Sequence, residues 1–222
     1  MKRQKAGFTR LFVLKILYIY CFLNHMLSLI EAHISASIDT KKRLLNDKAL
    51  VNTILQSTEL VIQAYRNNNK TLVAGNGGSA ADAQHIAAEF VVRFNFDRPG
   101  IPSIALTTDT SMLTATGNDY GFERLFARQV QAQGNAGDVF IGLSTSGNSP
   151  NIIKALEACK EKGIKTIGLT GESGGKMADL CDICIKVPSS ETPRIQEAHI
   201  LIGHIICHIV EDTLFGHLNA KS

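Results

Sequence analysis

The spacing of apolar residues changes near residue 70 of the chain. Over 27–67, apolar residues recur at intervals of three and four, which indicates helices that bury one face. The polar run 67–70 ends this pattern, and short apolar runs then alternate with stretches that suit helices. A final helix is predicted over 195–215. The strand-like runs are 71–75, 101–106, 138–143, 164–170 and 182–187, and the helix-compatible stretches between them are 80–94, 122–132, 150–162 and 175–180.

Strands that alternate with helices need crossover connections, and these predict a parallel sheet covered by helices on both faces. Five strands in this order predict a five-stranded, flavodoxin-like α/β sheet, with helices added before the first strand and after the last. In the strand order 2-1-3-4-5, the first and third strands are neighbours, and their connections leave on opposite faces. Ligands of such sheets bind outside the carboxyl ends of the strands at that point. We therefore expect one crevice between the loops that follow these two strands.

The composition is that of one globular domain of ordinary size. The 222 residues are 45% hydrophobic and 19% charged, which excludes a disordered chain. The net charge of +3 comes partly from the first ten residues, and no basic run with interleaved aromatic residues follows, so nucleic acid is not an expected partner. Five scattered cysteines, an odd number, indicate a reducing compartment, which we take to be the cytoplasm. Cys181 and Cys184 have the spacing of half a zinc site, but no second pair completes it, so we interpret them as residues in or beside a buried strand.

The N-terminal segment differs from the rest of the chain. Residues 11–23 are apolar apart from Lys15 and follow a basic stretch, which resembles a signal peptide or a short anchor. The run is short for a membrane span, and no convincing cleavage site follows it. Alternatively, the natural start is Met26, which opens an amphipathic, helix-like pattern. We expect residues 1–25 to be an extension outside the folded unit, and 26–222 to be a single domain that does not enter a membrane.

Two loops carry residues that suit an anionic ligand. The first, GNGGS over 75–79, leads from the first strand into a helix, where glycines let backbone N–H groups approach a ligand and the helix N-terminus favours an anion. It matches neither a dinucleotide motif nor a P-loop, and a plain tight turn is the alternative. The second, LSTSGNSP over 143–150, follows the third strand and offers four hydroxyls. Its alternative is a loop that only caps its helix.

Two helices carry residues with the spacing of metal ligands. His85 and Glu89 are four residues apart, so a helix places them on one face, and both can bind a divalent metal. By spacing alone, a surface hydrogen bond or a weak ion pair is the more common reason for such a pair. In the last helix, spacing nominates His204 with His208, whereas Gln196 shares the face of His204 only loosely. The residue pattern does not choose among these histidines.

Five long motifs match a known family. They are AGNGGSAADAQHIAAEF, FDRPGIPSIALTTDTSMLTATGNDYGFERLF, GDVFIGLSTSGNSPNI, LTGESGGKMADLCD and VPSSETPRIQEAHILIGHIICHIVEDTLFG, and they cover nearly everything from Met26 onward. In these motifs the chain resembles the phosphoheptose isomerases, a group of sugar isomerase (SIS) domain proteins. The resemblance implies a SIS domain that binds zinc. By motif, the zinc ligands would be His85, Glu89, Gln196 and His204, in place of the pair that spacing nominates.

The resemblance also implies a reaction and the residues that perform it. The ketose sedoheptulose 7-phosphate would be converted through an enediol to the aldose D-glycero-D-manno-heptose 7-phosphate, a precursor of ADP- or GDP-heptose. Glu89 would be the base and His204 the acid, and the second loop would hold the phosphate. A homotetramer with active sites between subunits is implied as well. The substrate contacts carried over are Asn76, Gly77, Gly78, Glu89, Asn118, Asp119, Ser144, Thr145, Ser146, Ser149 and Gln196.

Two other functions fit parts of the same pattern. A related group with this fold binds the bacterial replication initiator as a tetrameric adaptor, and its sequences contain stretches similar to RIQE and TLFGH. That group lacks the full set of His85, Glu89, Gln196 and His204, so this set favours the enzyme. A regulatory module that only senses sugar phosphates would keep the hydroxyls of 144–149 without needing His85 or Glu89. Both functions are therefore ranked below the isomerase.

Overall fold

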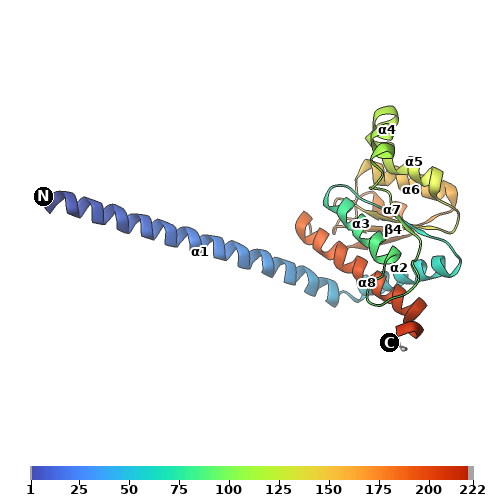
Figure 1. Ribbon diagram of the computed structural model, residues 1–222, viewed down its shortest axis with the longest axis horizontal. Helices are drawn as coiled ribbons and strands as arrows, with labels where there is room; N and C mark the ends of the chain where they lie inside the picture. Colours follow the sequence, from blue (N-terminus) through green and yellow to red (C-terminus); the bar gives the residue numbers. More distant parts are fainter. Residues whose placement is uncertain (1, 220–222) are drawn as a thin grey trace. The chain divides into compact units, whose positions relative to one another are not determined.

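The computed structural model describes the backbone of residues 2–219 and the side chains of 22–218 (Figure 1). The chain divides into two compact units, of which the first ends at Asp39 and the second begins at Thr40. Helix α1 (Lys2–Asn46) makes up the first unit and continues into the second. The second unit contains the sheet and the other helices, so the candidate site belongs to it.

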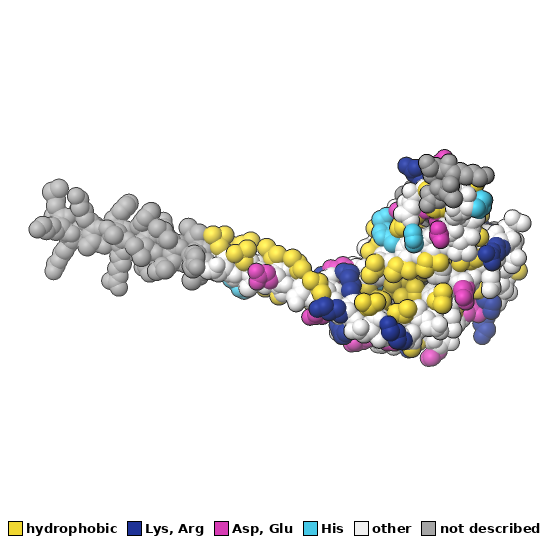
Figure 2. All heavy atoms as spheres, turned by 90° about the horizontal axis from the view of Figure 1, so that it is seen from below, with side chains coloured by type: hydrophobic (Ala, Val, Ile, Leu, Met, Phe, Trp, Pro, Cys, Tyr) yellow, Lys and Arg dark blue, Asp and Glu magenta, His cyan; other side chains and the backbone are white. Residues whose placement is uncertain are grey.

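Helix α1 carries a row of exposed apolar side chains in the first unit. The row is visible along the described part of the helix in Figure 2, and contiguous apolar surface of this kind often marks a binding site. The helix runs without a break past residue 25, so the backbone does not mark the boundary expected there, and the separate status of 1–25 stays a prediction. The side chains of 11–21, which resemble an anchor, lie outside the described residues. The exposed row consists of Phe22, Leu23, Met26, Leu27, Leu29, Ile30, Ile34 and Ile38.

The second unit is built on a five-stranded sheet in which every neighbouring pair of strands is parallel. The strand order is β2-β1-β3-β4-β5, which confirms the predicted fold. Each strand lies within one of the predicted apolar runs. The strands are β1 (Thr71–Ala74), β2 (Ser103–Ala105), β3 (Val139–Leu143), β4 (Lys165–Thr170) and β5 (Ile183–Lys186).

Helices cover both faces of this sheet. Val73 and Ile141 point into the core under α2, α3 and α8, whereas Leu72 and Phe140 point into the opposite core under α5 and α6. Successive strand residues alternate between the two cores, as the pleat requires, and burial on both faces explains why the strands are mainly apolar. These helices are α2 (Lys48–Arg66), α3 (Gly78–Val91), α5 (Leu125–Gln133), α6 (Pro150–Lys162) and α8 (Thr192–Asn219); the short α7 (Met177–Leu180) precedes β5.

Local sequence explains where several helices begin and end. Asp47 interrupts the long helical pattern before the sheet, because its carboxylate accepts a hydrogen bond from Leu50 N at 3.0 Å and starts α2. Pro150 opens α6, where its missing N–H costs nothing, and Gly163 ends α6 in the left-handed conformation with φ 68°. Pro150 and Gly163 therefore set the first and last turns of α6, the helix that follows the second loop.

Helix α4 (Thr110–Tyr120) is absent from the sequence prediction. Its residues show no apolar periodicity, because the helix stands at the surface and Thr116 is its one buried residue. The carboxylate of Asp109 starts it by accepting a hydrogen bond from Met112 N at 2.8 Å. The predicted helix over 122–132 is a short 3-10 turn, η1 (Phe122–Arg124), followed by α5.

Helix α8 is, among the described residues, the one helix long and apolar enough to cross a membrane. Its apolar side chains belong to the core, however, since Ile195, Ile202, Ile206 and Val210 are almost fully buried against the sheet and its neighbouring helices. The apolar character of α8 is therefore that of a core helix.

Candidate active site

The loops after β1 and β3 meet, as the predicted strand order requires. Ala74 at the end of β1 is paired with Gly142 near the end of β3. Just beyond these strands, the amide of Asn76 donates to Asn151 at 2.9 Å, and the amide of Asn151 donates back at 2.8 Å. Asn151 is almost fully buried in the first turn of α6. Two reciprocal hydrogen bonds therefore join the first loop to the start of α6, directly after the second loop, while a common crevice stays a prediction.

Glycines in the first loop let other groups come close. A Cβ on Gly75 would lie 2.4 Å from the carbonyl oxygen of Ser79, so the turn from β1 into α3 requires glycine there. Gly77 has φ 55° at the start of α3, a conformation that favours glycine. A Cβ on Gly78 would lie 2.7 Å from Nε2 of Gln196. This contact places the amide of Gln196, from α8, directly beside the predicted substrate loop.

The second loop is tightly folded around its hydroxyl groups. The hydroxyls of Ser144 and Ser149 are hydrogen-bonded to each other at 2.8 Å, and Ser144 is buried. Ser146 is exposed, and its hydroxyl accepts a hydrogen bond from Asn148 N. Thr145 is half-buried, and its carbonyl oxygen accepts a hydrogen bond from Gly171 N. The loop gathers all four predicted hydroxyls, while their contact with a phosphate stays a prediction.

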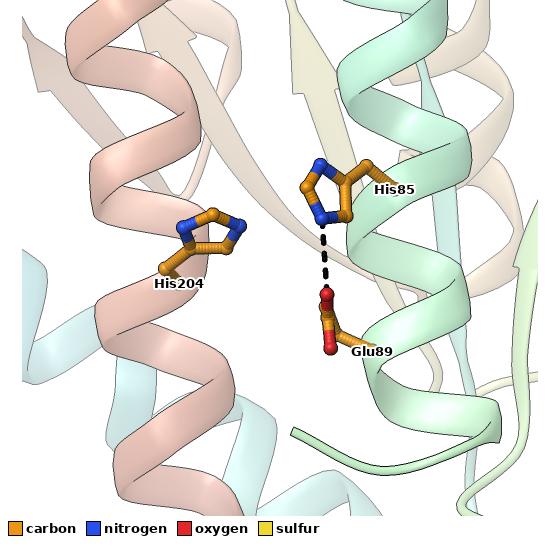
Figure 3. A group of neighbouring side chains, drawn as sticks. All are labelled: His85, Glu89 and His204. Carbon is orange, nitrogen blue, oxygen red and sulfur yellow. Dashed lines mark hydrogen bonds and ion pairs between the residues drawn. The ribbon is translucent and has the colours of Figure 1, made fainter. Parts of the chain in front are cut away.

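Helices α3 and α8 bring together three groups that can bind a metal. Figure 3 shows His85 and Glu89 on α3 facing His204 on α8. Nε2 of His85 lies 3.0 Å from Oε1 of Glu89, and the rings of His85 and His204 meet edge-on with centroids 4.9 Å apart. One ligand atom from each residue lies within 4.8 Å of the other two. The surface ion pair that spacing suggests thus exists, but a second histidine joins it from α8.

Close packing of the two helices explains this meeting. A Cβ on Gly203 would lie 2.7 Å from the side chain of Ile86, so the glycine lets α8 approach α3 closely. Gly203 precedes His204, and Ile86 follows His85, so the contact sets the two rings beside each other. Partial burial lowers the pKa of His204, and the adjacent His85 lowers it further, while the Glu89 carboxylate opposes the change. The neutral imidazole, which can bind a metal or accept a proton, is therefore favoured.

His208 does not join this group. Its ring lies at the exposed side of α8 and is hydrogen-bonded through Nδ1 to the side-chain amide of Asn95. The pair of His204 and His208 that spacing nominates is therefore not the pair that the structure assembles. The decisive neighbour of His204 is His85, which comes from a distant part of the sequence.

Asn118 and Asp119 lie on α4, apart from α3 and α8. Both are exposed, and Asn118 donates a hydrogen bond to the Asp119 carboxylate at 2.7 Å. Figure 1 shows α4 projecting from the side of the sheet domain. A pocket of 550 Å³ lies between the first loop and α4, bordered by Asn76, Gly77 and Gly117. The structure places α4 along the crevice, whereas substrate contacts of Asn118 and Asp119 stay predictions.

Asn151 is the residue of the crevice that sequence reasoning missed. The motif SGNSPN contains it, but its position in the first turn of α6 gives no indication of a partner. A buried asparagine needs hydrogen bonds, and only the meeting of the two loops shows that Asn76 supplies them.

Comparison with known proteins identifies the family. A model of the SIS domain matches residues 35–171. Phosphoheptose isomerase 2 of Campylobacter jejuni is 69% identical over 194 residues, which are 87% of this chain and 96% of that protein. The chain belongs to the phosphoheptose isomerase family. The phosphoheptose isomerase of Aneurinibacillus thermoaerophilus, 68% identical over 84% of this chain and 94% of its own length, supports the same assignment.

Solved structures of this family share the fold. The phosphoheptose isomerase of Neisseria gonorrhoeae superposes with a TM-score of 0.79 at 46% identity, covering 84% of this chain and 99% of that one. The family inferred from the five sequence motifs is thereby confirmed, together with the α/β SIS fold. The zinc ligands, the catalytic roles and the tetramer remain predictions for this chain.

Proposed function

We propose that this chain interconverts sedoheptulose 7-phosphate and D-glycero-D-manno-heptose 7-phosphate. The observation that carries the proposal is the group of His85, Glu89 and His204, of which two lie on the helix that starts at the glycine loop, in a chain whose relatives at 69% and 68% identity are phosphoheptose isomerases. A ketose–aldose isomerisation needs a base for a carbon-bound proton and a donor for the carbonyl oxygen. This group offers both.

Glu89 suits the role of the base. Its carboxylate is mostly buried, and it accepts a hydrogen bond when Nε2 of His85 carries the proton. It would remove the proton from C1 and return it to C2 of the enediol, so that one carboxylate serves both half-reactions. General base catalysis by a positioned carboxylate typically contributes about 10²–10⁴-fold in rate.

His204 suits the role of the proton donor to oxygen. Its lowered pKa favours the neutral ring, whose N–H would donate to the carbonyl oxygen O2 while the proton of the O1 hydroxyl returns to the ring, so that the imidazole is neutral again when the aldose has formed. The ring of His204 contacts two other rings, that of His85 and that of Phe94, whose centroid lies 5.5 Å from its own. Such packing would limit the orientations of the imidazole and so keep it directed at one oxygen atom.

The donor set fits a zinc ion. Two imidazoles and one carboxylate within 4.8 Å of one another are ligands that zinc prefers. Gln196 would be the fourth ligand, a proposal supported by its position on α8 and its amide beside Gly78. When bound, zinc would polarise the substrate's carbonyl group. The neutral state of His204 that burial favours is the state that binds a metal.

The crevice suits a sugar phosphate at its other end. The hydroxyls of 144–149 lie at the start of α6, where the helix N-terminus favours an anion. Asn76, Gly77 and Gly78 would lie along the sugar. The phosphate would thus be held at the second loop while the first two carbons reach the group on α3 and α8.

A homotetramer with active sites between subunits is part of this proposal. Exposed Asn118 and Asp119 on α4 would then complete the site of another subunit. The exposed apolar row of α1 supports association, because burial of such a surface drives the assembly of subunits. The mass of the protein in solution, measured by light scattering, tests the number of subunits.

Incubation of the full chain with sedoheptulose 7-phosphate tests the function. We expect the heptose 7-phosphate aldose to appear, to disappear when a chelator is added first, and to return when zinc is restored. Fructose 6-phosphate, a shorter ketose phosphate, serves as the control substrate and should react far more slowly. A chain that leaves sedoheptulose 7-phosphate unchanged in the presence of zinc would exclude the proposed function.

A further inference from the structure

An almost fully buried ion pair lies behind the candidate site. Nε of Arg98 lies 3.0 Å from Oε1 of Glu211, and both side chains are 1% exposed. Arg98 belongs to the segment between α3 and β2, and Glu211 lies on α8, about two turns after His204. Burial of two charges is costly unless their hydrogen-bonding groups are satisfied, so the surroundings of this pair show what it does.

The guanidinium of Arg98 holds the end of α3. Its NH2 donates to the carbonyl oxygen of Glu89 at 2.8 Å, and its NH1 donates to the carbonyl oxygen of Phe90 at 2.7 Å. The last carbonyl groups of a helix have no partner within the helix and carry partial negative charge, so a cation there satisfies and stabilises them. One of the two carbonyl groups belongs to the proposed base itself.

The carboxylate of Glu211 holds the segment that follows α3. Oε1 accepts a hydrogen bond from Phe94 N at 2.7 Å, and Oε2 accepts one from Asn95 N at 2.6 Å. The ring of Phe94 in turn lies against the ring of His204. Glu211 is therefore linked to both catalytic groups, to Glu89 through Arg98 and to His204 through Phe94.

We propose that Arg98 and Glu211 are positioning residues, which set the separation of the Glu89 carboxylate from the His204 imidazole. The two side chains connect the C-terminal end of α3 to α8 about two turns beyond His204, while Gly203 and Ile86 bring the same helices together directly before His204. The inference rests on the proposed function. It predicts that weakening this pair slows the chemical step more than it weakens substrate binding.

The planar fork of Arg98 is essential to this arrangement. Its three nitrogen atoms reach Glu211, the carbonyl oxygens of Glu89 and Phe90, and that of Pro99 at the same time. A lysine has one ammonium group on a flexible stem and cannot reproduce these directions. Arg98→Lys therefore keeps the positive charge but loses most of the hydrogen bonds that the guanidinium group makes.

The chain offers a matched control in Asp138. Its buried carboxylate also pairs with a cation, Lys70, at 2.6 Å, and also accepts hydrogen bonds from two backbone N–H groups, those of Lys70 and Asn135. It precedes β3, at the opposite edge of the sheet from the crevice. Asp138→Asn and Glu211→Gln make the same chemical change in two similar environments.

The experiment compares kcat, KM and thermal stability of the full-length variants with sedoheptulose 7-phosphate as substrate. We expect Glu211→Gln and Arg98→Lys to lower kcat about 10- to 100-fold with KM within about twofold, as a small misplacement of reacting groups does. Asp138→Asn should keep the kcat of the unchanged chain despite a comparable loss of thermal stability.

Two results would overturn the inference. One is a Glu211→Gln or Arg98→Lys variant with undiminished kcat, and the other is an Asp138→Asn variant that loses kcat to the same extent. If Glu211→Gln fails to fold, Arg98→Lys decides the question by itself. An unchanged chain that makes no product would instead refute the proposed function, and the positioning role would fall with it.

Discussion

The side-chain amides of Asn76 and Asn151 donate hydrogen bonds to each other across the crevice. Asn76 lies in the loop after β1, and Asn151 lies in the first turn of α6, just after the loop that follows β3. The pair is thus the direct link between the part of the crevice near the candidate metal ligands and the part near the predicted phosphate site.

Replacement of Asn151 by leucine should loosen this link. Asn151→Leu keeps a similar volume but leaves the Asn76 amide without its partner, so we expect a loss of about 1–3 kcal/mol in the free energy of unfolding. KM should rise, because the first loop would no longer be held against α6. Urea unfolding and steady-state kinetics measure the two effects. Asn52→Leu, on the exposed face of α2, is the control, and it should change neither the stability nor KM. An unaltered KM for Asn151→Leu would show that the first loop is ordered without the hydrogen bonds between Asn76 and Asn151.

Replacement of Glu89 by glutamine should remove the base and keep the shape. We expect kcat to fall about 10²–10⁴-fold, the usual contribution of a general base. The control is Glu157→Gln, which makes the same change in an exposed ion pair with Lys154 on α6 and should leave kcat intact. Turnover at the normal rate by Glu89→Gln would remove Glu89 from the mechanism.

Replacement of His204 and replacement of His208, both on α8, should have very different effects on activity. His204→Ala removes a ring that contacts His85 and Phe94, so we expect a loss of activity comparable to that of Glu89→Gln. His208→Ala removes an exposed ring that contacts Asn95 and should retain kcat within a few-fold. Circular dichroism tests whether both variants are folded. An inactive but folded His208→Ala variant would contradict the grouping of His204 with α3.

Zinc should stabilise the chain through the group on α3 and α8. A ligand that binds only the folded state adds about 2.7 kcal/mol to stability at a concentration 100-fold above its dissociation constant. We expect a rise in the melting temperature of the chelator-treated protein when zinc is added. His85→Ala should abolish this rise and lower the zinc content measured by mass spectrometry, whereas His217→Ala, at the exposed end of α8, should not. A full rise in His85→Ala would place the metal elsewhere.

His199 should make the fold less stable in mild acid. Its ring is fully buried, Nε2 lies 3.2 Å from the carbonyl oxygen of Thr170, and burial lowers its pKa from 6.5 to about 4. Between these two values the unfolded chain binds a proton that the folded chain does not. Stability therefore falls as pH decreases from 6.5 towards 4, by about 3 kcal/mol in total from this residue.

Urea unfolding at several pH values isolates the contribution of His199. His199→Leu loses the titrating group, so its stability should depend less steeply on pH between 6.5 and 4 than that of the unchanged chain. Other groups titrate in both proteins and cancel in the comparison. Two parallel stability curves would show that His199 is protonated in the folded state at its ordinary pKa.

Much of the fold follows from the sequence because each strand lies in a short, mainly apolar run. Strands covered on both faces need such runs, so all five strands are recognisable from the pattern of apolar residues. The same reasoning fails for α4, whose surface position leaves Thr110–Tyr120 without apolar periodicity. An element that contributes little to the core leaves little trace in the pattern of apolar residues.

The candidate site, too, could be predicted from the sequence only in part. The two loops could be placed side by side because parallel strands carry their ends to one edge of the sheet. The partner of His204 could not be chosen from spacing, because the choice depends on the close approach of α8 to α3 at Gly203 and Ile86. The spacing of residues along the sequence relates side chains within one helix, whereas these candidate ligands come from two helices, α3 and α8. Only the likeness to a known family pointed to the pairing in advance.

The order of α3 and α8 along the chain has a consequence for protein synthesis. Glu89 is translated well before His204 and Glu211. A nascent chain that has been translated through β3 and the loop after it contains both loops of the predicted crevice. It still lacks α8, the helix that carries His204. Catalytic competence must therefore wait until α8 has been synthesised and has docked against α3, and ribosome-bound chains arrested before α8 should be inert.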